Sequence, residues 1–124
     1  MNLFIMATQS FKQLLIWEKA HEFVLSVYKY TNSFPKTELY ALTSQFKRAA
    51  ISIAANIAGG YKKKGKADKA RLMNIAQGSI EECQYYLILA KDLGYGENSF
   101  LINLLDEISK MLQSYITKIL SSNS

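Results

Sequence analysis

Lysines gather in one short stretch of this 124-residue chain, where their charge could bind phosphate groups. Residues 61–71 read YKKKGKADKAR and hold six basic residues against one acidic residue, Asp68. The six are Lys62, Lys63, Lys64, Lys66, Lys69 and Arg71. The stretch therefore has a net charge of +5, which equals that of the whole chain. Such a concentration favours a polyanionic partner. A solvated connection between two helices would have the same composition, and the sequence leaves both interpretations open.

Three nearby residues are predicted to assist phosphate binding. Lys47 and Arg48 precede the basic stretch, and an arginine guanidinium can contact phosphate through two parallel hydrogen bonds. Tyr61 adjoins the lysines and offers a ring on which a base could stack. No motif of a known RNA-binding module accompanies them, so we expect binding through phosphates and not sequence-specific readout.

Residues 60–67, GYKKKGKA, match the first seven positions of the phosphate-binding loop of nucleotide hydrolases. The eighth position is Ala67, which has no hydroxyl for magnesium. The segment before the loop has helical periodicity, whereas the motif requires a strand. The sequence therefore argues against nucleotide hydrolysis at this loop.

The remaining chemistry-bearing residues do not form a catalytic or metal-binding pattern. His21 is the one histidine and Cys83 the one cysteine, too few for a tetrahedral zinc site. Glu81 and Glu82 are adjacent on a helix and point in different directions. A di-iron bundle needs Glu-x-x-His on each of two helices, which a chain with one histidine cannot provide. We therefore predict no enzymatic activity, no metal and no cofactor.

Four helical segments must position these residues, at about 12–31, 36–58, 66–93 and 99–120. In each one, apolar residues recur at spacings of three and four, as one helix face requires. We expect Gly59-Gly60 to end the second helix and Gly94 and Gly96 the third. Asn98 or Ser99 can cap the fourth, and Gly78 suggests a tight crossing of the third. Short connections then predict a single all-α domain over residues 1–124, an antiparallel up-down four-helix bundle.

Composition also bears on location and assembly. A lone cysteine fits a reducing compartment, and the sequence has neither a signal peptide nor an apolar run long enough to span a membrane. We therefore expect a cytoplasmic protein with no membrane partner. The aromatic residues Trp17, Phe23, Tyr28 and Tyr30 and the pair Tyr85-Tyr86 exceed what one four-helix core can hold. Excess aromatic residues are typical of a protein interface and favour self-association.

Several motifs together resemble one known family, the four-helix bundle proteins first noticed as products of 23S ribosomal RNA intervening sequences. The resemblance covers residues 11–115. Three stretches carry it, and the matching positions are Pro35, Glu38, Leu42, Thr43 and Gln45 in the first, Arg48, Ala49, Ser52, Ile53, Asn56, Ile57 and Ala58 in the second, and Gly78, Ser79 and Glu82 in the third. One departure is Gly59, which stands where the family has Glu. Any site that this carboxylate supports would be altered here.

The resemblance implies a homopentameric barrel of four-helix bundles with no enzymatic activity. It also implies kinship with the accessory protein of diversity-generating retroelements, a basic pentamer that binds a reverse transcriptase and nucleic acid. Our leading hypothesis is therefore a non-enzymatic oligomeric adaptor that binds RNA or a ribonucleoprotein through phosphate contacts. A nucleic-acid enzyme such as a reverse transcriptase is a possible further partner. The alternative is a protein scaffold with an acidic protein partner and no role in nucleic-acid binding.

Overall fold

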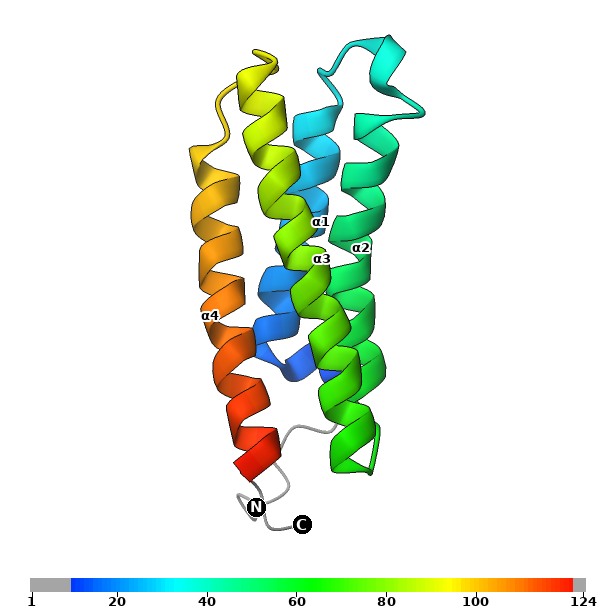
Figure 1. The fold of residues 1–124 in the computed structure, drawn as a ribbon, viewed down its shortest axis with the longest axis vertical. Helices are drawn as coiled ribbons and strands as arrows, with labels where there is room; N and C mark the ends of the chain where they lie inside the picture. The colour runs from blue at the N-terminus through cyan, green and yellow to red at the C-terminus, as the bar shows by residue number, and fades with distance from the viewer. Residues whose placement is uncertain (1–9, 122–124) are drawn as a thin grey trace.

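Four long helices make up the computed structural model, which describes residues 10–121. They are α1 (Leu15–Thr31), α2 (Leu42–Tyr61), α3 (Lys66–Asp92) and α4 (Ser99–Ser121). Successive helices run in opposite directions, and each packs against the next, with α4 returning to α1 (Figure 1). No strand occurs in the described part of the chain. The structure thus confirms the all-α four-helix bundle.

The core forms from the inner face of each helix, because apolar side chains at spacings of three and four share one side of a helix. Phe46 of α2 is fully buried near one end of this core. The rings of Phe23, Tyr30 and Tyr86 surround it, with centroids 6.5, 6.4 and 5.8 Å from its own. Phe23 is therefore a core residue and not part of an exposed aromatic excess. Tyr28 and Tyr85 do remain exposed.

The first helix begins three residues later than predicted, at Leu15. A separate 3₁₀ turn, Phe11–Gln13, comes before it, and the Ser10 hydroxyl accepts a hydrogen bond from the Lys12 amide. Leu14 has an extended backbone that separates turn and helix. The Phe11 ring packs edge-on against Trp17 at a centroid distance of 5.0 Å. This ring contact secures the turn against the first turn of α1.

The second helix begins at Leu42, six residues later than predicted. Residues Lys36–Glu38 form their own 3₁₀ turn, and Ala41 leaves helical geometry with φ −124° and ψ −108°. The Glu38 carboxylate accepts hydrogen bonds from the Leu42 amide at 3.4 Å and from the Tyr95 hydroxyl at 2.6 Å. Glu38 thus both caps α2 and ties this loop to the connection between α3 and α4. Leu39, whose spacing from Leu42 and Phe46 would place it on the buried face of a longer helix, is half exposed.

The Gly59-Gly60 pair does not end α2, because the helix continues to Tyr61. A Cβ at position 60 would lie 2.5 Å from the Met73 Cε and 3.3 Å from the Leu72 Cβ. Gly60 is therefore needed for the close approach of α2 and α3. Gly78, by contrast, has no atom of the described chain within 4 Å of an added Cβ. The tight crossing that we predicted at Gly78 lies instead at Gly60.

The connection between α3 and α4 depends on two glycines, as predicted. Gly94 has φ +78° and Gly96 has φ +126°, conformations that side chains disfavour. The predicted cap of α4 is wrong, because the Glu97 carboxylate accepts from the amides of Asn98 and Ser99 at 2.8 and 2.7 Å and from the Ser99 hydroxyl. These hydrogen bonds, led by that from the hydroxyl, lower the pKa of Glu97. The buried Asn98 amide donates instead to the Leu87 carbonyl.

Candidate nucleic-acid interface

The predicted basic stretch occupies one end of the bundle. The connection between α2 and α3 lies at the same end as the last turns of α4, because α2 and α4 both run toward it (Figure 1). This topology brings a further lysine, Lys118 of α4, to a pocket that lysines of the stretch also line. We call the resulting set of lysines the basic end: Lys62, Lys63, Lys64, Lys66, Lys69 and Lys118.

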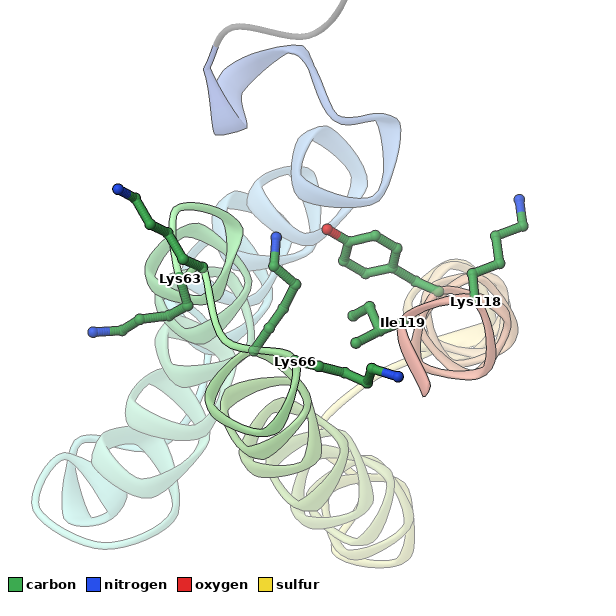
Figure 2. A pocket seen from close by; sticks show the side chains of 7 residues that line it. Lys63, Lys66, Lys118 and Ile119 are labelled. Carbon is green, nitrogen blue, oxygen red and sulfur yellow. The ribbon is translucent and has the colours of Figure 1, made fainter. Parts of the chain in front are cut away.

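A pocket of about 370 Å³ opens at the basic end. Figure 2 shows Lys63 and Lys66 on its α2–α3 side and Lys118 and Ile119 on its α4 side. Lys64, Lys69 and Tyr115 complete the lining. Ile119 is buried, while Lys63, Lys64 and Lys118 are exposed. The pocket therefore has an apolar wall near the core and a cationic rim toward solvent.

Four lysines of the basic end have no acidic partner among residues 10–121. The ion pairs among residues 10–121 join Lys19 to Glu107 at 3.3 Å, Arg71 to Asp68 at 3.9 Å and Lys110 to Asp106 at 3.1 Å. None of them involves Lys62, Lys63, Lys64 or Lys118. Because like charges repel, such a cluster lowers the stability of the free bundle. An anion bound there would relieve this repulsion.

Tyr61 organises two lysines of the basic end. The ammonium groups of Lys62 and Lys69 each lie 5.6 Å from the centre of the Tyr61 ring, within the range of a cation–π interaction. The Lys69 ammonium also donates a hydrogen bond of 2.8 Å to the Tyr61 carbonyl. Lys69 is thereby held at the end of α2. Stacking of Tyr61 on a nucleic-acid base stays a prediction.

Tyr115 contributes a hydrogen-bond donor to the pocket. Burial raises the pKa of its phenol, and the nearby Tyr61 raises it further. The phenol therefore stays protonated at neutral pH. A protonated hydroxyl among ammonium groups can donate to a bound anion without adding negative charge.

Three of the predicted phosphate-binding residues lie elsewhere or are already paired. Arg48 precedes Lys62 by fourteen residues, which corresponds to about 21 Å along α2. It lines a separate pocket of about 210 Å³ between α2 and α3, together with Ser52 and Glu82. The Lys47 ammonium lies 4.5 Å from the Tyr28 ring centre, beside α1. Arg71 is exposed and paired with Asp68. The structure thus separates Lys47 and Arg48 from the basic end.

Sequence analysis missed Lys118, which follows the basic stretch by almost fifty residues. The predicted up-down topology was sufficient to place Lys118 near the basic stretch. In an up-down bundle the end of the fourth helix lies beside the start of the third, so basic residues in those two turns share one corner. The pattern Tyr115, Lys118 and Ile119 could have been assigned to that corner.

The other chemistry-bearing residues sit in surroundings that do not activate them. Burial, and next the charge of Glu82, raises the pKa of the Cys83 thiol far above neutrality. The His21 ring stacks on Trp17 at 5.1 Å, beside an apolar groove. Within residues 10–121, no three side chains of His, Cys, Asp or Glu come close enough to hold a metal ion. None of the described helices is long and apolar enough to cross a membrane.

Comparison with protein families adds an identification to this geometry. The family described as 23S rRNA-intervening sequence protein matches residues 12–114. The chain belongs to this family. A solved relative in the S23 ribosomal protein family, from Bacteroides thetaiotaomicron VPI-5482, superposes with a TM-score of 0.74 at 26% identity. The match covers 83% of this chain and 96% of that one. Comparison with curated proteins gave no match.

Membership of the 23S rRNA-intervening sequence family fixes the fold more closely than the function. The solved S23 relative is itself described as a protein with unknown function, and neither description names a reaction. Gly59, the position at which the family resemblance implies a Glu, is exposed in the last turn of α2. A Cβ there would meet only the Leu72 Cδ1, at 4.0 Å, so the backbone leaves room for a side chain. The helix continues past Gly59 to Tyr61, so this glycine does not loosen the end of α2.

Proposed function

We propose that this protein is a non-enzymatic cytoplasmic adaptor that binds RNA, alone or within a ribonucleoprotein, through phosphate contacts at the basic end. One observation carries the proposal: lysines from two segments far apart in the sequence meet at one end of the bundle, and four of them, Lys62, Lys63, Lys64 and Lys118, form no ion pair within residues 10–121. Ammonium groups bind phosphates by releasing condensed counterions, which requires no sequence-specific contact.

We also propose that the protein acts as a homopentamer. Apolar side chains exposed on the outer faces of the bundle support self-association, among them Leu25 and Ile51 on α1 and α2 and Ile88 and Ile102 on α3 and α4. The number five rests on the family resemblance. A ring of identical subunits would repeat the basic end five times and give one RNA several points of attachment, which raises avidity without new contacts.

Size-exclusion chromatography with light scattering, before and after nuclease treatment, tests both parts of this proposal. The expected mass after nuclease is five times the 14.0-kDa chain. Before nuclease, we expect a larger mass and an excess absorbance at the nucleic-acid maximum, because RNA from the cell stays bound at low salt.

Two results would count against the proposal in different ways. A monomer after nuclease would remove the assembly while leaving RNA binding open. A nuclease-resistant complex with a co-purifying acidic protein, and no bound nucleic acid, would favour the scaffold alternative instead.

A further inference from the structure

Some lysines of the basic end line the pocket, whereas others lie on the surface outside it. Lys62 is exposed at this end and does not line the pocket, so it belongs to the outer surface. Lys63, Lys64, Lys66, Lys69 and Lys118 do line it, and they come from three segments: the α2–α3 connection, the first turn of α3 and the last turns of α4. At about 370 Å³, the pocket falls within the size range of small-molecule sites.

The wall of this pocket is suited to part of a nucleotide. Ile119 is buried and Tyr115 is half-buried, so they form the inner side. The Lys66 side chain extends toward Ile119, and the Lys63 and Lys118 side chains point outward (Figure 2). An apolar wall can contact a sugar or a base while the ammonium groups meet a phosphate. The protonated Tyr115 phenol adds one neutral donor.

The start of α3 adds positive charge at the same corner. Gly65 precedes this helix and provides no side-chain cap, so the first-turn amides have no side-chain acceptor from the capping position. The helix dipole places partial positive charge there. The one acidic residue of that first turn, Asp68, is exposed, pairs with Arg71 and does not line the pocket.

We propose that this pocket binds the phosphomonoester at the end of an RNA strand. This inference rests on the proposed RNA binding and adds to it a preference for one chemical feature of the RNA. The outer lysines, with Lys62 among them, would contact internal phosphates of the same strand.

A terminal phosphomonoester and an internal phosphodiester differ in charge and in connectivity, and both differences favour the monoester in this pocket. A phosphomonoester carries about −1.5 to −2 charge at neutral pH and has three free oxygens. An internal phosphodiester carries a single charge and continues into the chain on both sides. Tyr115 and Ile119 line the pocket together with the lysines, and a strand end can turn into this open pocket more easily than a strand that continues on both sides. Several ammonium groups around one site also match the higher charge of the monoester.

Three RNAs of identical sequence, with an internal fluorophore, test the inference by anisotropy. One carries a 5′-phosphate, one a 3′-phosphate, and one has hydroxyls at both ends. We expect at least one phosphorylated RNA to bind about tenfold more tightly than the hydroxyl RNA, which corresponds to about 1.4 kcal/mol. The two phosphorylated arms identify the end that is recognised. The preference should shrink below about pH 6, where the monoester loses its second charge while the lysines keep theirs.

Two variants with equal loss of charge separate the pocket from the surface. Lys118→Gln changes a pocket lysine, and Lys62→Gln changes an exposed lysine outside the pocket. We expect Lys118→Gln to abolish most of the preference for phosphorylated over hydroxyl RNA. We expect Lys62→Gln to lower the affinity for all three RNAs by the same factor. Equal binding of the three RNAs by the unaltered protein would overturn the inference and leave the proposed function standing. Loss of the preference in both variants alike would also overturn it. No binding of any RNA would remove the proposed function together with the inference.

Discussion

Replacement of Lys62, Lys63 and Lys64 together by Gln is expected to weaken RNA binding about a hundredfold near 0.1 M salt. For single strands the logarithm of affinity changes with the logarithm of salt concentration by about −0.7 per phosphate contacted. Three lost contacts therefore reduce the slope by about 2 and the affinity by about two decades at that salt. All three lysines are exposed in the connection after α2. Anisotropy titrations over a range of salt concentrations measure both quantities.

A matched control removes the same charge at the other end of the bundle. Lys29, Lys36 and Lys91 are exposed residues near the connections that join α1 to α2 and α3 to α4. Their triple replacement by Gln lowers the net charge equally, so a protein that attracts RNA only through its total charge would lose the same affinity. We expect the control to keep the salt slope within about half a unit of the unaltered protein. Equal losses in the two triple variants would contradict a localised binding site.

Phe46→Ala is expected to lower the free energy of unfolding by about 3–5 kcal/mol, since it removes a large buried ring and leaves a cavity. The Phe46 side chain is fully buried and contacts rings of α1 and α3, so its loss affects three helices at once. Urea denaturation followed by circular dichroism measures the change. The protein concentration must be held constant, because self-association would make the apparent stability depend on it.

Tyr40→Ala is the matched control for this core substitution. Tyr40 is also aromatic and lies only six residues earlier, yet it is 91% exposed. We expect a change within about 0.5 kcal/mol, as for most surface substitutions. A large effect of Tyr40→Ala in the assembled protein would mean that Tyr40 is buried between subunits. A small effect of Phe46→Ala would contradict the packing described for the core.

Helical periodicity was sufficient to find all four helices, and local signals placed some of their ends. The start of α3 at Lys66 and the turn at Gly94 were predicted correctly, because the conformational demands of glycine act over a few residues. The start of α2 was missed, since it depends on the Glu38 carboxylate, which bonds both Leu42 and the distant Tyr95. A contact between residues 57 positions apart leaves no trace in a local pattern.

The glycine pair in α2 shows a second limit of local reasoning. Two consecutive glycines are typical of a helix end, and Gly59-Gly60 were wrongly predicted to end α2. Packing outweighs this local signal, because Gly60 lies against Leu72 and Met73 of α3. A helix that gains this close contact continues despite the low helical propensity of glycine.

The candidate site was predicted in part for similar reasons. Lysines close together in the sequence stay close in space, so the α2–α3 part of the basic end was visible at once. Lys118 joins them only through the path of the chain, whereas Lys47 and Arg48 are carried away from them by the length of α2. Proximity in sequence was therefore sufficient to predict the lysine cluster of the α2–α3 connection. It was not sufficient to predict the pocket, which also needs residues of α4.

Lysine acetylation followed by mass spectrometry, with and without bound RNA, is the most direct test of where phosphate contacts form. We expect RNA to protect Lys62, Lys63, Lys64 and Lys118 from acetylation, because their ammonium groups would be engaged by phosphate. Lys29, Lys36 and Lys91 should react at the same rate in both samples, since they lie near the opposite end of the bundle. Protection spread evenly over both groups, or confined to the second, would contradict RNA binding at the basic end.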